Sequence, residues 1–281
     1  MISVFNTDQD PLFSATMFNA TLQKEFAVRV EGGSVTNLYY EKLKNIDVSY
    51  PSLPEQKKIA AFFDIIDNLI TLHQRKLDVF KKYKRGLVQK IFSCDSSTYE
   101  KMALRDLTKQ ITARPAPKSE YPVYSVNNKN GFVPQSIQFE DRKIASDNIE
   151  KYKIVSTGQF GYNPSRINVG SINYLKDNID VVVSPLYVVF ECVDELDKDY
   201  LYNFTKSREF KQQRIINTEG SVRDTLSYDG FSNIMIPLPS INEQRKKVSV
   251  LNGLDNLIFI EEKAIKNIQK FKSALLQQMF I

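Results

Sequence analysis

The 281-residue chain carries few of the side chains that enzymes most often use for catalysis. His73 is its only histidine, which excludes a histidine-rich zinc site, and no nearby serine or cysteine has the sequence context of a catalytic triad. Cys94 and Cys192 are too few for a cysteine-rich metal site or a disulfide framework. No cofactor is predicted, and an enzyme such as a nuclease is disfavoured because no carboxylate cluster has credible metal-binding spacing.

Arginines on polar turns offer another chemistry, the recognition of nucleic acid. Arg166 follows a predicted strand and an Asn-Pro turn, from which its guanidinium can reach a guanine edge or a phosphate. The alternative is a surface arginine paired with Asp177 or Asp180. Arg223 lies in the polar loop 220–224, whose small residues allow a close approach of the backbone. Both arginines are therefore candidate DNA contacts.

The segment 127–131 reads Asn-Asn-Lys-Asn-Gly and supplies amide groups suited to adenine, although such runs also form ordinary turns. It contributes Asn127, Asn128 and Lys129 as candidates. The remaining candidates are phosphate contacts or supporting polar groups: Arg114, Lys118, Lys143, Ser165, Asn168 and Ser221.

Composition narrows the class of protein. A net charge of +5 and an isoelectric point near 8.9 point mildly to a polyanionic partner. The 18 phenylalanines and 14 tyrosines supply more apolar surface than a disordered chain carries. No apolar run approaches the roughly 18 residues that span a bilayer, and no signal peptide is present. A cytoplasmic protein of about two domains, without membrane partners, is predicted.

An internal repeat is the main feature of the sequence. Residues 51–58 (Pro-Ser-Leu-Pro-Glu-Gln-Lys-Lys) return as 239–246 (Pro-Ser-Ile-Asn-Glu-Gln-Arg-Lys), and the similarity continues faintly upstream. The chain therefore reads as about one and a half copies of one unit. Four segments are expected: the C-terminal remnant of a first globular domain at 1–50, a long helix at 51–95, a complete domain at 96–238 and a second long helix at 239–281.

Each copy is predicted to end in a long helix. Ser52 with Glu55, and Ser240 with Glu243, are possible capping boxes. Apolar residues then recur with a period near 3.5, and each helix of about 38 residues would be roughly 55 Å long. We expect an antiparallel coiled coil; the alternative is two surface helices on separate domains. The expected seam comprises Ile59, Phe62, Ile66, Leu69, His73, Leu77, Phe80, Leu87 and Ile91, with Leu251, Leu254, Ile258, Ile265, Ile268, Phe271, Leu275 and Met279.

The segment between the helices reads as a mixed α/β domain. Short strands are predicted at 121–126, 154–155, 160–162, 171–175 and 181–190, because β-branched and aromatic residues there are bounded by Gly, Asn and Pro. A helix is predicted at 199–216, and the same helix at about 11–28 near the N-terminus.

This arrangement resembles the DNA-specificity subunit of Type I restriction-modification systems. The residues that carry the resemblance are 160–166 (Phe-Gly-Tyr-Asn-Pro-Ser-Arg), 183–190 (Val-Ser-Pro-Leu-Tyr-Val-Val-Phe), 219–221 (Glu-Gly-Ser) and the twice-found Pro-Ser-x-x-Glu-Gln helix start. The resemblance implies that a target-recognition domain at 96–238 reads one half of a bipartite site in double-stranded DNA.

The resemblance also implies the partners. The paired helices would form a spacer that docks DNA methyltransferase (M) subunits, with restriction (R) subunits as further partners, and the chain itself would be non-catalytic. Glu55, Gln56, Glu243 and Gln244 would help to seat the methyltransferase, although helix capping explains them more simply.

The sequence departs from the family pattern by keeping only about the last 50 residues of a first recognition domain. We expect the chain to regain a second domain either as a homodimer or with a complementing specificity-subunit fragment. Two rivals remain open at this point. One is a DNA-binding regulator or decoy that binds the methyltransferase without forming an active complex, and the other is a structural coiled-coil adaptor, which leaves the Asn/Arg/Tyr-rich loops of 110–230 unexplained.

Overall fold

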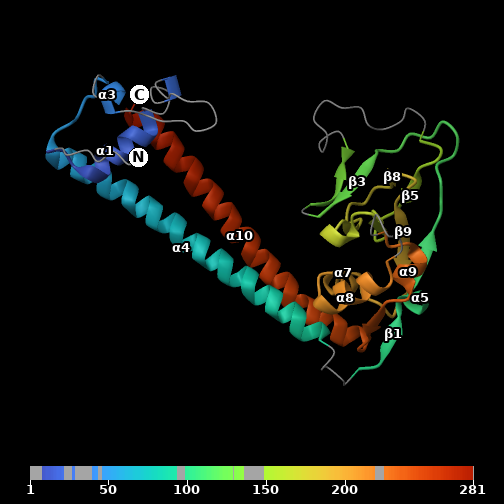
Figure 1. Ribbon diagram of the computed structural model, residues 1–281. Coiled ribbons are helices and arrows are strands. Elements are labelled where there is room, and N and C mark those ends of the chain that lie inside the picture. Colours follow the sequence, from blue (N-terminus) through green and yellow to red (C-terminus); the bar gives the residue numbers. More distant parts are fainter. Residues whose placement is uncertain are drawn as a thin grey trace. The chain divides into compact units, whose positions relative to one another are not determined.

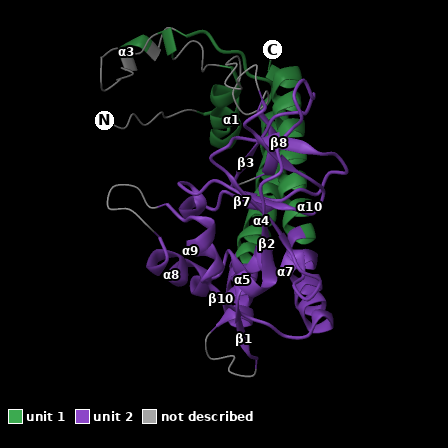
Figure 2. Cartoon of the chain, turned by 90° about the vertical axis from the view of Figure 1, so that its right-hand side faces the viewer, with its two compact units in different colours: residues 1–81, 256–281 green, residues 82–255 purple. Residues whose placement is uncertain are grey.

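The computed structural model describes residues 8–21, 27–28, 40–43, 46–93, 99–128, 130–135, 149–218 and 225–280. The chain divides into two compact units (Figure 2). The first unit contains residues 1–81 and 256–281, and the second contains residues 82–255.

Two helices of 40 residues each, α4 (Leu53–Phe92) and α10 (Ile241–Phe280), run side by side (Figure 1). In the first unit, the Lys272 ammonium lies 2.6 Å from the Asp67 carboxylate, and Lys81 lies 2.7 Å from Glu262. The residue number falls along α10 as it rises along α4, so the pairing is antiparallel, as predicted. His73 lies on the seam, where its Nδ1 is 2.5 Å from Glu261 Oε2, a residue 188 positions later.

The seam of the coiled coil differs in part from its predicted composition. Phe63 and Ile66 are buried, as are Leu251 and Leu254, but Phe62 and Leu69 are 43% and 42% exposed. Phe271 and Met279 on α10 are exposed as well. Both helices carry apolar residues on more than one face, so the sequence period alone could not predict which of these residues are buried between them.

The start of α10 shows one of the two hydrogen bonds of the predicted capping box, from the Ser240 N–H to the Glu243 carboxylate. The Ser240 backbone N–H and its hydroxyl both donate to Glu243 Oε2, at 3.2 and 2.8 Å. At the start of α4, the Glu55 and Gln56 backbone N–H groups donate to the Ser52 carbonyl, each at 2.9 Å. The repeated Ser-x-x-Glu sequence therefore marks both helix starts.

The second unit is a mixed α/β domain built on a four-stranded antiparallel sheet. The strand order is β2-β9-β6-β7, and three two-stranded pairs, β1–β10, β3–β4 and β5–β8, complete it. The strands are β1 (Lys101–Ala103), β2 (Thr108–Ile111), β3 (Tyr124–Asn127), β4 (Gly131–Pro134), β5 (Lys153–Val155), β6 (Phe160–Tyr162), β7 (Ile172–Tyr174), β8 (Val181–Val183), β9 (Val188–Cys192) and β10 (Met235–Pro237).

The second unit also contains short helices, and it differs from the prediction at one helix and at one strand. The short helices are α5 (Leu104–Leu107), the 3₁₀ turn η1 (Ile167–Val169), α7 (Lys198–Phe204), α8 (Arg208–Ile216) and α9 (Tyr228–Ser232). The helix expected at 199–216 is two helices, because the Ser207 hydroxyl caps a new start by accepting from the Phe210 N–H at 3.1 Å. The strand expected at 181–190 is interrupted between β8 and β9, where Pro185 stands in a turn.

An aromatic core holds the second unit together. The Phe160 and Phe190 rings stack with centroids 4.9 Å apart, and Phe231 lies 4.8 Å from Phe190. Phe92, at the end of α4, packs its ring against Tyr200 at 4.9 Å. Because such rings each bury a large apolar area, the last turn of α4 belongs to the core of the second unit.

The first unit has a smaller core. The helices of this unit are α1 (Pro11–Thr21), the short helix α3 (Tyr40–Leu43) and the parts of α4 and α10 within residues 1–81 and 256–281. Phe13 and Met17 on α1 are buried with Ala60 on α4, and the Phe280 ring lies 5.5 Å from Phe13. The helix predicted at 11–28 is observed to Thr21 and again at residues 27–28; residues 22–26 lie outside the described part of the chain.

Candidate nucleic-acid interface

Three of the predicted DNA contacts meet around one hollow in the second unit, which we call the amide hollow. Asn127 and Asn128 reach it from the end of β3, and Arg166 reaches it from the turn between β6 and η1. The hollow has a volume of about 250 Å³. Its full lining is Ser125, Val126, Asn127, Asn128, Gln135, Asn163, Arg166, Val169, Ser171 and Tyr187.

The turn that carries Arg166 is fixed by local hydrogen bonds. Asn163 Oδ1 accepts from the Ser165 N–H at 3.1 Å, and the Asn163 carbonyl accepts from the Arg166 N–H at 3.0 Å. The Ser171 hydroxyl donates to the Val126 carbonyl at 2.5 Å, which ties the far side of the turn to β3. Arg166 therefore stands on a rigid backbone beside the asparagines.

The Arg166 side chain is exposed and available for a ligand. Within the described residues it makes no ion pair with Asp177 or Asp180, so the alternative of a surface pair with those carboxylates is not observed. A guanidinium presents five N–H donors in a plane, which suits the acceptor edge of guanine or a phosphate.

The amide hollow also contains a buried acceptor that sequence reasoning missed. The side-chain oxygen of Gln135 is buried, and no partner for it is found among the described residues. An unpaired buried polar group costs about 1–3 kcal/mol, so a donor from a bound ligand would be stabilised there. Gln135 and Asn163 gave no signal because they are brought to the hollow only by the pairing of β3 with β4 and by the turn after β6.

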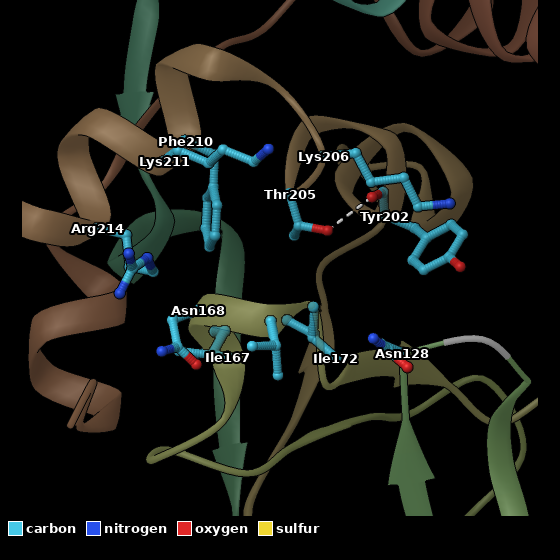
Figure 3. Close-up of a pocket in the computed structure, with 12 residues that line it drawn as sticks. Asn128, Ile167, Asn168, Ile172, Tyr202, Thr205, Lys206, Phe210, Lys211 and Arg214 are labelled. Carbon is cyan, nitrogen blue, oxygen red and sulfur yellow. Dashed lines mark hydrogen bonds between the residues drawn. The ribbon is translucent and has the colours of Figure 1, made fainter. Parts of the chain in front are cut away.

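A second hollow adjoins the first and shares Asn128 and Val169 with it; we call it the basic hollow (Figure 3). Its volume is about 330 Å³. α8 places Lys211 and Arg214 on one side, and Asn168, a predicted candidate, lies opposite. No carboxylate belongs to the described residues that line either hollow.

The basic hollow has an ordered cation at its edge. The Lys206 ammonium lies 3.7 Å from the centroid of the Tyr202 ring, a cation–π contact that orients it. Desolvation lowers the pKa of Lys206, while the carboxylates of Asp255 and Asp199 act in the opposite direction. Lys206, Lys211 and Arg214 were also missed from the sequence; Lys211 and Arg214, three residues apart on one helix, were the available signal.

Other predicted contacts are more scattered. Arg114 is exposed and lies near Lys153, whose pKa is lowered by desolvation and by the Arg114 charge, and whose ammonium donates to the Tyr187 carbonyl at 2.6 Å. Lys118 and Ser165 are exposed but line neither hollow. Lys129, Lys143, Ser221 and Arg223 lie outside the described residues.

The residues expected to seat a partner divide into two kinds. Glu55 is exposed and Glu243 is half-buried, but Gln56 and Gln244 are fully buried, which leaves these two glutamines no surface for direct docking. Gln244 Nε2 donates to the carbonyls of Glu195 and Pro239 at 2.8 and 2.9 Å, and its Oε1 accepts from the Asp197 N–H. The glutamine therefore fastens the recognition domain to α10.

Gln56 makes the corresponding contacts in the first unit. Its Nε2 donates to the Pro51 carbonyl at 2.8 Å and to Gln9 Oε1 at 2.6 Å, and its Oε1 accepts from the Asp10 N–H at 3.0 Å. Asp10 in turn accepts from the Phe13 N–H at the start of α1, as Asp197 does from Tyr200 at the start of α7. The repeat thus extends to hydrogen bonds that the alignment of residues alone does not reveal.

Comparison with known proteins identifies the family. Residues 3–82 and 97–270 match the family described as the Type I restriction modification DNA specificity domain. The chain belongs to this family. Two curated proteins of Methanocaldococcus jannaschii are similar to it: the Type I restriction enzyme MjaVIII specificity subunit, 23% identical over 88% of this chain and 64% of its own length, and the putative type I restriction enzyme MjaX specificity subunit, 22% identical over 84% and 58%.

The chain therefore spans less than two thirds of the length of these two specificity subunits. Solved structures share the specificity-domain fold. The Type-I restriction-modification system S subunit from M. genitalium has a TM-score of 0.61, with 16% identity over 97% of this chain and 74% of that one. The HsdS subunit from Thermoanaerobacter tengcongensis has a TM-score of 0.54, with 16% identity over 96% and 70%.

Two further searches bear on the class of protein. Among the described residues, no group of three or more His, Cys, Asp and Glu side chains is placed to hold a metal ion. Within the same residues, no helix combines the length and apolar character needed to cross a membrane.

Proposed function

We propose that the second unit reads one half of a bipartite site in double-stranded DNA, as the non-catalytic specificity subunit of a Type I restriction-modification complex. The amide hollow supplies donors and acceptors for base edges, and the basic hollow supplies cations for the adjoining phosphates. The observation that carries the proposal is the meeting of Asn127, Asn128 and Arg166 at one hollow without a lining carboxylate.

Replacing Arg166 tests this function. Duplexes selected from a random library by the full chain define a cognate site, and fluorescence anisotropy then measures affinity for cognate and random duplexes. Arg166→Ala removes a donor fork from the base-reading hollow, so we expect cognate affinity to fall by about 1–3 kcal/mol and discrimination at one base pair to relax. Equal loss on cognate and random duplexes would contradict base reading by Arg166.

Two further variants separate base reading from charge. Lys211→Ala lies in the basic hollow and should weaken all duplexes alike, with a salt dependence shallower by about one unit of slope. Arg75→Ala removes the same charge from an exposed position on α4 and should leave affinity unchanged. A salt response that is flat for the unmodified chain would exclude phosphate contacts altogether.

The helices support a second part of the proposal, the docking of two methyltransferase subunits. Exposed apolar residues occur on α4 and recur at the equivalent positions of α10. The pairs are Phe62 and Val250, Leu69 and Leu257, and Leu72 and Ile260. Because the same surface is presented twice, we expect it to bind two copies of one partner.

Stoichiometry measures this docking directly. Leu69→Asp and Leu257→Asp each place a charge in one stripe, so each should reduce the complex from two methyltransferase subunits to one, as seen by native mass spectrometry. Thr71→Asp adds the same charge on another face of α4 and should keep two subunits. A complex that retains both subunits in the Leu69→Asp, Leu257→Asp double variant would contradict docking on these stripes.

The complete complex would also engage restriction subunits and a second recognition domain, from a homodimer or a complementing fragment. Sequence-specific adenine methylation by the chain together with its methyltransferase separates the specificity subunit from a regulator or decoy. Methylation at the selected cognate site is expected; DNA and methyltransferase binding without methylation would assign the decoy role.

A further inference from the structure

Residues 99–103, which follow α4 in the second unit, are bound by β10 and by the start of α10. β1 pairs antiparallel with β10, with Met102 opposite Ile236. The Leu238 N–H donates to the Glu100 carbonyl at 3.0 Å, the Tyr99 hydroxyl donates to Glu243 Oε1 at 3.2 Å, and the Lys247 ammonium lies 4.1 Å from the Tyr99 ring centroid. Residues 99–103 are thus bound as an extended strand with one aromatic anchor.

The first unit contains the equivalent seat for a strand, and none of the described strands lies in it. The equivalents of β10, Leu238, Glu243 and Lys247 in the first repeat are residues 47–49, Tyr50, Glu55 and Ile59. All of them line one hollow of about 670 Å³, which we call the strand seat. Its remaining lining is Phe13, Met17, Thr21, Pro51, Met279 and Phe280.

The surroundings of the strand seat are also those of its occupied counterpart. Phe280 closes it against Phe13 at 5.5 Å, as Phe92 packs on Tyr200 at 4.9 Å beside residues 99–103. Residues 46–50 carry no strand pairing within the described chain. A segment that makes no strand pairing among the described residues, and that lies beside an apolar hollow, is a place where a strand can be added.

We propose that the strand seat binds the leading strand of a further recognition domain, in the manner of residues 99–103. This strand would lie antiparallel to residues 47–49 and place an aromatic side chain against Glu55 and Ile59. Residues 99–103 of this chain are themselves engaged by β10, so the occupant comes from a further domain. The inference deepens the proposed complementing partner by naming its contact surface.

A peptide tests the seat without DNA or methyltransferase. A labelled peptide of residues 97–107 carries the strand and its tyrosine, and its anisotropy is measured against the full chain. Saturable binding is expected, and a peptide with Tyr99→Ala should bind at least tenfold more weakly because it loses the aromatic anchor. Because no DNA is present, failure of this experiment is distinguishable from failure of DNA recognition.

Two proline variants of the full chain locate the peptide. Leu238 donates to Glu100 and the Leu104 N–H donates to the Ile234 carbonyl at 2.9 Å, so the hydrogen-bonded positions alternate as 234, 236 and 238. Val48 is equivalent to Ile236, and Val48→Pro should abolish peptide binding by removing a donor. Ser49 is equivalent to Pro237, so Ser49→Pro is the matched control and should bind normally.

A gain of affinity completes the test. Ile59→Lys recreates the cation that Lys247 places over Tyr99, and about two- to fivefold tighter binding of the peptide is expected. Absence of peptide binding, or equal effects of the Val48→Pro and Ser49→Pro changes, would overturn the proposal. A chain that runs as a dimer by light scattering, with Val48→Pro making it monomeric and no peptide bound, would assign the seat to a second copy instead.

Discussion

At the scale of single residues, two buried glutamines, Gln56 and Gln244, connect the starts of the long helices to the segments packed against them. Gln56 and Gln244 each follow a glutamate at a helix start. Each makes two hydrogen bonds to a distant segment and one to the proline carbonyl just before its own helix. Without the glutamine, the Asp197 N–H and the Glu195 carbonyl would lose their partner in a buried region. The repeated Glu-Gln pair is therefore a structural joint as well as a helix start.

We expect Gln244→Ala to lower the free energy of unfolding by about 2–4 kcal/mol, because three hydrogen bonds are lost and their partners stay buried. Urea unfolding of the full chain measures the change. Gln277→Ala, at an exposed position of the same helix, should lie within about 0.5 kcal/mol of the unmodified chain. Coincident unfolding curves for the two variants would show that the joint is dispensable.

At the scale of elements, the long helices do more than pair with each other. Val88 and Phe92 at the end of α4, and Val248 and Leu251 near the start of α10, are part of the core of the second unit. The recognition domain is therefore assembled around both helix ends, and its stability depends on residues that sequence segmentation assigns to the spacer.

Phe92→Ala should destabilise the second unit by about 3–5 kcal/mol, since it removes a fully buried ring that contacts Tyr200 and Phe204. Phe62→Ala on the same helix deletes an exposed ring and should cost less than about 1 kcal/mol. Thermal unfolding followed by near-UV circular dichroism compares them. Similar losses from both variants would contradict the assignment of Phe62 to the outer face.

The long helices and their starts were predictable from the sequence. The residues buried between the helices, and those that line the two hollows, were predictable only in part. The Pro-Ser-x-x-Glu-Gln stretches and the apolar period indicated the type and extent of the helices, and the expected closeness of the ends of the intervening domain indicated their antiparallel direction. Phe62 and Phe63 are adjacent apolar residues, and only packing selects the second. Arg166 and Asn128 followed from turn chemistry. Gln135 could not be found, because the pairing of β3 with β4 brings it to the amide hollow. Lys211 and Arg214 gave only the weak signal of their spacing on one helix, because that spacing does not show which hollow they line.

At the scale of the whole molecule, the two copies of the sequence repeat make equivalent ion pairs between α4 and α10. Asp67 pairs with Lys272 in the first unit, and their equivalents Asp255 and Lys84 pair in the second at 2.5 Å. The carboxylates of the two pairs are 53% and 49% exposed, so solvent screens both to a similar degree.

Double-mutant cycles with alanine at each of these two pairs should therefore give equal coupling energies, each about 0.2–1 kcal/mol, and both should shrink in 0.5 M salt. Urea unfolding of the four variants of each cycle measures them. Coupling at one pair alone would show that the two repeats have diverged in how they hold the helices together.

The glutamine joint has a consequence for how such a protein changes its target. Among the described residues, the Gln244 side chain bonds only to main-chain atoms, the Glu195 and Pro239 carbonyls and the Asp197 N–H. Hydrogen bonds to main-chain atoms do not depend on which side chains the second unit carries at those positions. The side chains of the surface that we propose reads DNA can therefore vary while these hydrogen bonds to α10 stay the same.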